Sequence, residues 1–138
     1  MDMGDKQIIP LVPSYAEDML IVDPECAQEI VDIVTEGGYY VRFGKDYEAR
    51  LKQLFTHREK AYLVNSQWFE HLKHTNHSMY SMHLANIGNM RILYVLGRHI
   101  VFLCAFKEKE GRGKKRQSYV QYVPVAEKRL EQYKEVLA

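Results

Sequence analysis

The sequence predicts an α+β domain in which helices come first, three or four antiparallel strands follow, and one helix closes the chain. Three observations support this prediction. Apolar residues recur at helical spacing between residues 26 and 55, β-prone segments follow one another between residues 80 and 106, and a second helical pattern spans residues 123–137. Runs of helices beside runs of strands are typical of α+β proteins. At 138 residues, we expect a single domain over residues 1–138.

The N-terminal region reads as an arm followed by a helix. Prolines indicate an extended arm over residues 1–22, and residues 1–45 are interpreted as an atypical N-terminal extension of the domain. Asp23-Pro24-Glu25 supplies an N-cap, a proline in the first turn and a carboxylate near the positive end of the helix dipole. Gly37-Gly38 is expected to end this helix. Residues 39–43 are β-prone and bounded by glycines, which predicts a short strand.

Two further helices are predicted before the sheet. Asp46 is a candidate cap for a helix whose apolar residues continue to Phe55 with a period near 3.6. Ser66 is a candidate cap for a short helix that reaches Leu72.

Three consecutive strands are predicted next. Residues 80–84 alternate between apolar and polar side chains, which is typical of a strand with one buried face. Residues 90–96 and 99–106 are almost entirely apolar, as central strands are. The glycine-containing segment 86–89 and the Gly97-Arg98 pair are expected to form the two turns.

The C-terminal third of the chain is basic. Residues 1–90 hold 8 Lys and Arg against 13 Asp and Glu, whereas residues 91–138 hold 11 against 5. The basic residues gather in a polar loop over residues 107–117. We expect the last helix to begin near Val123, because proline at position 124 suits only a first turn. This asymmetry favours a polyanionic partner, although a solvated basic surface is the alternative.

The composition excludes several classes of protein. With 46% hydrophobic and 27% charged residues, the chain has the composition of an ordinary globular protein. No apolar run approaches the ~20 residues that cross a bilayer, and the first ten residues do not resemble a secretory signal. Cys26 and Cys104 lie among apolar neighbours, so we expect a cytoplasmic protein with reduced cysteines and no membrane partner.

Four motifs resemble a known family when they are taken in order. They are the strand Tyr80–Leu84, the strand opening Arg91-Ile92-Leu93-Tyr94, the turn Phe106-Lys107-Glu108-Lys109 and the helix segment Ala126–Leu130. Together they resemble the RelE/HigB group of the RelE/ParE superfamily of type II toxins. The resemblance covers residues 63–137.

The resemblance implies a function. Proteins of this group cut messenger RNA in the ribosomal decoding site, and a cognate antitoxin protein silences each of them. The RNA 2′-hydroxyl attacks the neighbouring phosphate and leaves a cyclic phosphate, while side-chain cations supply the charge that a metal would supply elsewhere. The resemblance therefore implies a metal-independent mRNA interferase without a cofactor, whose partners are an antitoxin and translated mRNA.

The candidate site residues follow from those motifs and from the basic loop. An arginine at the start of the central strand can clamp the scissile phosphate at two points, and a neutral histidine can take the hydroxyl proton. Tyrosines can stack on bases or bond to phosphate. The candidate catalytic residues are Arg91, Lys107, Lys109, His83 and Tyr119. The candidate RNA-binding residues are Arg98, Arg112, Lys114, Lys115, Arg116 and Tyr122.

Alternatives remain open at this point. The loop lysines are also compatible with a solvated surface, His83 with an exposed histidine outside any site, and Tyr122 with helix packing. A ParE-like toxin that inhibits DNA gyrase by protein binding, or a degenerate homologue that binds only its antitoxin, would share the fold. His71, His74 and His77 form an HxxHxxH pattern that would present a metal site on a helix, but the following Thr and Asn suggest that such a helix ends there, so no metal is expected.

Overall fold

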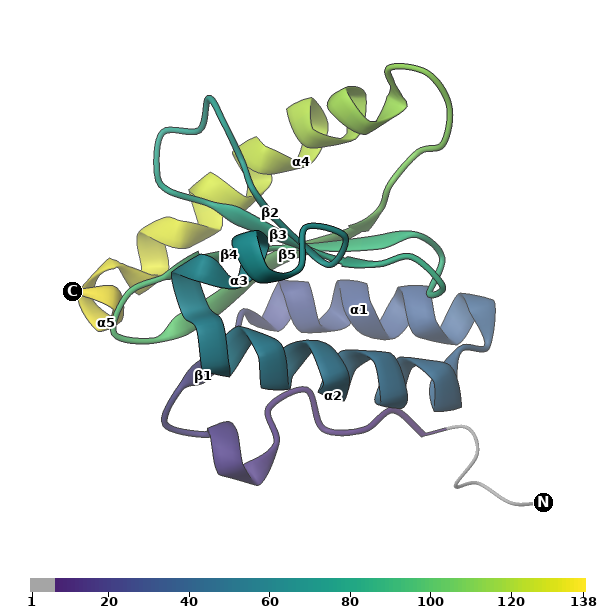
Figure 1. Ribbon diagram of the computed structural model, residues 1–138, viewed down its shortest axis with the longest axis horizontal. Coiled ribbons are helices and arrows are strands. Elements are labelled where there is room, and N and C mark those ends of the chain that lie inside the picture. Colours follow the sequence, from purple (N-terminus) through teal and green to yellow (C-terminus); the bar gives the residue numbers. More distant parts are fainter. Residues whose placement is uncertain (1–6) are drawn as a thin grey trace.

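The computed structural model describes residues 7–138 and confirms a mixed α+β architecture with more strands than expected (Figure 1). Over the described residues, a sheet of five strands has the order β1-β5-β4-β3-β2. The strands are β1 (Leu20–Val22), β2 (Phe69–His71), β3 (Tyr80–Leu84), β4 (Met90–Leu96) and β5 (Ile100–Lys107). The expected run of three antiparallel strands is present as β3, β4 and β5. The sheet is larger than the expected three or four antiparallel strands, because β2 joins β3 as a fourth antiparallel strand and β1 joins β5 in parallel as a fifth.

Helices cover both faces of the sheet. Helices α1 (Pro24–Gly37) and α2 (Tyr40–His57) lie on one face, and α4 (Lys114–Leu130) crosses the other (Figure 1). The short helices α3 (Ala61–Val64) and α5 (Lys134–Leu137) and three 3-10 turns complete the described elements, the turns being Ser14–Ala16, Arg58–Lys60 and Glu131–Tyr133. Two apolar clusters result, one between the sheet and α1–α2 and one between the sheet and α4.

Helix α1 begins and ends as the sequence predicts. The Asp23 carboxylate accepts hydrogen bonds from the backbone N–H groups of Glu25 at 3.0 Å and Cys26 at 3.2 Å. Such a cap stabilises a helix by about 1 kcal/mol. Pro24 occupies the first turn, and Gly38 ends the helix with a φ of 67°, a conformation that favours glycine.

Residues 39–43 do not form the predicted strand but begin α2. Four residues at helical spacing are fully buried, namely Phe43, Tyr47, Leu51 and Leu54. The apolar period of this helix therefore starts at Phe43, four residues before Tyr47. Asp46 therefore lies inside the helix rather than capping it, and its carboxylate pairs with Arg42 at 3.1 Å.

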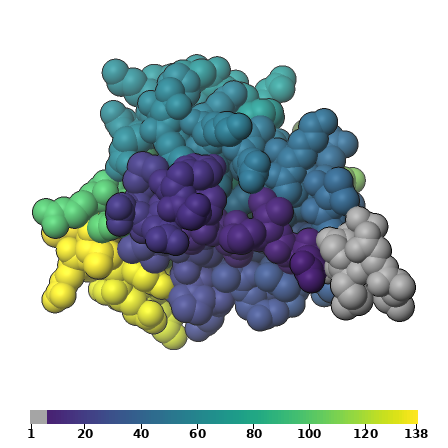
Figure 2. Space-filling view, turned by 90° about the horizontal axis from the view of Figure 1, so that it is seen from below, coloured from purple at the N-terminus to yellow at the C-terminus, as the bar shows by residue number. Residues whose placement is uncertain are grey.

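The N-terminal arm packs against the helices. In the space-filling view its purple atoms lie across the face where α1 and α2 are exposed (Figure 2). The Tyr47 hydroxyl donates to the Leu11 carbonyl at 2.7 Å. Ile8 and Ile9 pack against the same core, and a Cβ on Gly44 would stand only 3.3 Å from the Ile9 side chain. Gly44 thus permits the close approach of the arm, which explains a glycine within α2. The part of the predicted arm before residue 7 lies outside the described residues.

Two other predicted boundaries were wrong. The segment after Ser66 forms β2 rather than a helix, because Phe69 is buried opposite Met82 and the turn before it is closed by Asn65, whose side chain accepts from the Trp68 N–H at 3.2 Å. Helix α4 begins at Lys114, nine residues before Val123, and contains Pro124.

Pro124 is tolerated within α4 because it lies on the exposed side of the helix. Proline lacks the N–H that would bond to the carbonyl of Val120. Both residues are exposed, so water can take the place of the missing donor.

A β-bulge holds α4 in place above the sheet. The pairing of β4 with β5 shifts at Leu93/Tyr94, so the consecutive β5 residues Leu103 and Cys104 both face α4. The Leu103 carbonyl that the bulge frees accepts from Arg129 at 2.9 Å, and Glu29 accepts from the Ala105 N–H at 3.0 Å. Arg129 also pairs with Glu29 at 2.8 Å. This network ties α4 to α1 and fixes where the C-terminal end of α4 meets the sheet.

Candidate active site

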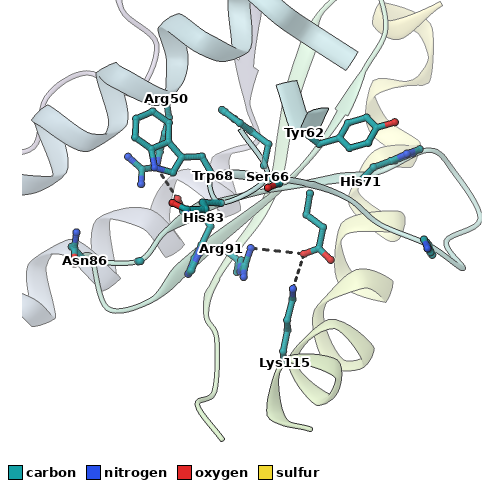
Figure 3. Close-up of a pocket in the computed structure, with 14 residues that line it drawn as sticks. Arg50, Tyr62, Ser66, Trp68, His71, His83, Asn86, Arg91 and Lys115 are labelled. Atoms are coloured by element: carbon teal, nitrogen blue, oxygen red, sulfur yellow. Dashed lines mark hydrogen bonds and ion pairs between the residues drawn. The ribbon is translucent and has the colours of Figure 1, made fainter. Parts of the chain in front are cut away.

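A cavity of about 800 Å³ opens at the edge of the sheet beside β2 (Figure 3). Its lining comes from α2, α3, β2, β3, β4 and the first turn of α4. Four cationic side chains and one carboxylate line it. Three ring side chains, which belong to exposed or half-buried residues, line its β2 side. The cations are Arg50, Lys73, Arg91 and Lys115, the carboxylate is Glu70, and the three rings are Tyr62, Trp68 and His71.

Arg91 occupies the floor of the cavity and is 7% exposed. It lies opposite His83 on β3 and opposite Phe106 on β5, so its side chain faces α4 with theirs. Its Nε lies 3.4 Å from Glu108 and its Nη1 lies 3.8 Å from Glu70. These are ion pairs without good hydrogen-bond geometry, since Arg91 Nε and Glu108 Oε1 have no hydrogen-bond partner within the described chain. The terminal nitrogens of Arg91, Nη1 and Nη2, donate no hydrogen bond within the described chain, so they are the donors that a bound anion can satisfy.

Lys115 and Tyr119 meet Glu70 from the other side. The Lys115 ammonium lies 3.1 Å from the Glu70 carboxylate, and the Tyr119 hydroxyl donates to the same oxygen at 2.9 Å. Lys115 and Tyr119 are one helical turn apart on α4, so they share a face. Burial raises the pKa of Tyr119 well above its ordinary value, and the phenol therefore keeps its proton at neutral pH.

His83 is oriented by a chain of polar groups. The Asn89 side-chain amide donates to both the backbone and the carboxylate of Glu108 at 3.2 Å, which fixes the amide oxygen toward His83. His83 Nε2 lies 2.5 Å from that oxygen, so Nε2 carries the proton. Nδ1 is then unprotonated, and it has no hydrogen-bond partner among residues 7–138. Burial lowers the pKa of His83, with Arg91 and Arg50 adding to the effect of burial. A neutral imidazole with a free lone pair results.

Arg50 and Trp68 form the side of the cavity away from α4. The Arg50 guanidinium lies 4.1 Å from the centre of the Trp68 ring. Its Nε donates to the His83 carbonyl at 2.7 Å, as the dashed line in Figure 3 marks. Strand β2 pairs only with residues 80–82, so the His83 carbonyl lies beyond the end of β2. Arg50 donates to this carbonyl in place of a backbone N–H from a neighbouring strand.

The structure brings four of the predicted residues together and leaves the others outside. Arg91, His83 and Lys115 line the cavity, and Tyr119 contacts Glu70 in its wall. Lys115 was expected only in the peripheral RNA-binding group. Lys107 is opposite Met90, whose side chain belongs to the core beneath α1 and α2, so Lys107 lies on the face away from Arg91. Lys109 is exposed in the loop, where its backbone N–H donates to Ser118 at 3.1 Å.

The remaining basic candidates are spread over the surface. Arg98 lies in the β4–β5 turn, beyond the C-terminal end of β4, whereas Arg91 is near the start of that strand. The backbone N–H of Arg98 donates to the Leu137 carbonyl. Arg112, Lys114 and Arg116 are exposed around the start of α4. Tyr122 stacks on Phe106 with ring centres 4.4 Å apart, which is the packing alternative that the sequence left open.

Several lining residues are not among the predicted site residues, and Glu70, Trp68 and Arg50 are those on which the geometry depends. Glu70 and Trp68 fell in a segment interpreted as a helix, so the alternation that carries Glu70 to the face of α4 was not seen. Arg50 belongs to a helical stretch in which only the apolar face was considered. Its spacing of three to four residues from Tyr47 and Leu54 places it on the buried face, and a charged residue at such a position was the available signal.

The HxxHxxH pattern does not lie on a helix. His71 belongs to β2 and bonds to Ser78 at 3.0 Å, while His74 and His77 lie in the loop before β3. Within residues 7–138, no group of three or more His, Cys, Asp or Glu side chains is arranged to hold a metal ion.

Comparisons with protein-family models, curated proteins and solved structures find no match to this chain. Among the described helices, none is both long enough and apolar enough to cross a membrane.

Proposed function

We propose that this protein is a metal-independent endoribonuclease of the mRNA-interferase type, with Arg91, His83, Lys115 and Tyr119 as its active site. The observation that carries the proposal is the neutral His83 imidazole, held by Asn89 and Glu108 beside the Arg91 guanidinium in an open cavity. A positioned base beside a positioned cation is what attack of a ribose hydroxyl on phosphate requires.

The first step needs a base for the 2′-hydroxyl. His83 Nδ1 takes the 2′-hydroxyl proton as the 2′-oxygen forms a bond to phosphorus. Because the pKa of His83 is lowered, the imidazole is ready to accept a proton across the neutral range. The Glu108–Asn89 chain stabilises the tautomer that presents Nδ1 rather than Nε2.

Charge then develops on the phosphate oxygens, and cations of the cavity stabilise it. Arg91 is planar and can contact two oxygens at once, while Lys115 adds a second positive charge. Glu70 holds both cations in the free protein. We propose that a phosphate displaces the Glu70 carboxylate from them when RNA binds.

The leaving 5′-oxygen needs a proton as its bond to phosphorus breaks. Tyr119 keeps its proton because burial raises its pKa, and its hydroxyl contacts Glu70 at the wall of the cavity, one helical turn from Lys115. We assign Tyr119 as this donor. The products are a 2′,3′-cyclic phosphate and a 5′-hydroxyl, and exchange with solvent returns His83 and Tyr119 to their starting states.

The toxin assignment rests on the resemblance of residues 63–137 to the RelE/HigB group. In this proposal the arrangement of α1, α2, the three consecutive antiparallel strands and α4 is a RelE-like fold, the substrate is mRNA under translation, and a cognate antitoxin blocks the cavity. The protein would act in the cytoplasm, where its substrate is.

Induction in cells tests this proposal. Wild-type protein should arrest growth and deplete messages, and primer extension should show new 5′ ends within coding regions. A His83→Gln variant should do neither at equal abundance. Growth arrest with intact messages and loss of DNA supercoiling would contradict the proposal and favour gyrase inhibition instead.

A further inference from the structure

Arg50 is a buried cation without a carboxylate partner. It is 5% exposed, and over residues 7–138 no carboxylate oxygen pairs with its guanidinium within 4.0 Å. The acidic residue one helical turn before Arg50 on α2, Asp46, pairs its carboxylate with Arg42. Burying an unpaired charge is expensive, so most buried arginines have an anionic partner.

The protein satisfies only part of the Arg50 guanidinium. Nε donates to the His83 carbonyl at 2.7 Å and Nη1 donates to the Asp46 carbonyl at 3.1 Å. A guanidinium carries five N–H groups, and Nη2 has no acceptor among the described residues. The Trp68 ring covers one face of the group at 4.1 Å. The charge is thus held in one orientation, with donors left unused.

Those donors belong to a residue that lines the active-site cavity (Figure 3). Arg50 contacts the carbonyl of His83, and Arg91 is the cross-strand neighbour of the same residue. The two guanidinium groups therefore flank His83. A neutral donor would suffice to bond the His83 carbonyl, so the positive charge points to an anionic ligand.

We propose that Arg50 binds a second phosphodiester, adjacent in the strand to the one that Arg91 holds. This inference rests on the proposed function, which makes the Arg91-bound phosphate the scissile one. The smallest ligand that fills the cavity is then a single strand with two consecutive phosphates. Arg50 is a binding residue in this account, and Trp68 is a positioning residue that keeps the guanidinium in place.

The single tryptophan of the chain allows a direct test. Trp68 is in contact with Arg50, so its fluorescence reports on this site without any need for cleavage. The ligands are 2′-deoxy oligonucleotides, which cannot be cut by 2′-hydroxyl attack: a dinucleotide with one phosphate and a trinucleotide with two. The variants are Arg50→Gln and a matched control, Lys52→Gln, which removes the same charge from an exposed position of α2.

The wild-type protein should bind the two-phosphate ligand about 10-fold or more tightly than the one-phosphate ligand, since a charge-assisted contact is added. Arg50→Gln should remove most of this difference and make the salt dependence of binding shallower by about 0.7 in the log–log slope. Lys52→Gln should keep the wild-type ratio.

Equal affinity of the wild-type protein for the two ligands would overturn the proposal, and this measurement does not depend on any variant folding. An unchanged ratio in a folded Arg50→Gln variant would overturn it as well. If the wild-type protein prefers the two-phosphate ligand but does not cleave RNA, the inference about Arg50 is supported and the proposed function is contradicted.

Discussion

Replacement of Arg91 by alanine tests whether this residue stabilises a transition state or only the fold. Arg91 and Glu108 are both largely buried, with side-chain exposures of 9% and 10%, and their charged groups lie 3.4 Å apart. Removing one member of a buried pair leaves the other charge without its partner, at a cost of about 3–5 kcal/mol. We expect a value near the lower end, about 3 kcal/mol, because Glu108 keeps its hydrogen bond from Asn89. Domains of this size unfold with about 5–15 kcal/mol, so Arg91→Ala should fold but melt early.

The effect on cleavage should be separable from the effect on stability. Loss of one preorganised charge slows catalysis by about 10²–10³-fold. A second change, Glu108→Gln, removes the stranded carboxylate and should restore about 0.5–3 kcal/mol of stability to Arg91→Ala. It should not restore the rate, because the phosphate still lacks its guanidinium.

The assay combines urea unfolding with single-turnover cleavage of RNA at a temperature where all variants are folded. The reasoning is refuted if the Arg91→Ala/Glu108→Gln protein regains both stability and rate, since Arg91 would then act only through the fold. It is equally refuted if folded Arg91→Ala cleaves at the wild-type rate. Arg91→Lys should recover little activity, because an ammonium cannot make the planar two-point contact.

Other consequences follow from the same site. Cleavage should rise with pH through an apparent pKa below the ordinary 6.5, since burial lowers the pKa of His83 and only the neutral ring accepts a proton; a His83→Gln profile that keeps this acidic limb would contradict the assignment. The same lowered pKa means that stability declines as pH falls below about 6.5, because the unfolded chain takes up the proton more readily, and His83→Gln should flatten that decline in urea titrations. Lys115→Ala should slow single-turnover cleavage at least tenfold, whereas Lys107→Ala, on the other face of the sheet, should change it less than twofold; the reverse order would argue against this cavity. Glu70→Gln should retain cleavage and tighten RNA binding, and complete loss of cleavage in a folded Glu70→Gln protein would make Glu70 the base instead. EDTA should leave the rate unchanged if side chains supply the charge, and loss of activity that zinc restores would contradict that view.

Much of the sheet was predictable because its strands are long and their burial is simple. Strands β3, β4 and β5 have apolar or alternating sequences bounded by turn residues, so sequence period and structure agree. Strands β1 and β2 have only three residues each. Segments of three residues show too little periodicity to be identified as strands. Their pairing partners lie about 80 positions away along the chain for β1 and about 10 positions away for β2.

The site residue that the sequence marks most clearly is a charge within an apolar strand. Arg91 interrupts MRILYVL, and this contrast marked it in the sequence. The sequence does not distinguish Lys115 from its basic neighbours. The helical geometry of the first turn of α4 determines which of these side chains reaches Glu70. Glu70 depended on the existence of β2. The spacing of Arg50 from Tyr47 and Leu54 marks it as buried, but its hydrogen bond to the His83 carbonyl is a property of the folded sheet alone.

The central claim is that His83 and Arg91 direct a ribose hydroxyl onto the adjacent phosphate, and the chemistry of the new RNA ends tests it most directly. Purified protein is added to a message under translation, and the cleaved 3′ ends are identified. We predict 2′,3′-cyclic phosphate ends with the wild-type protein and none with a folded His83→Gln variant. An intact message, or ends that carry a 3′-hydroxyl beside a 5′-phosphate, would contradict the account.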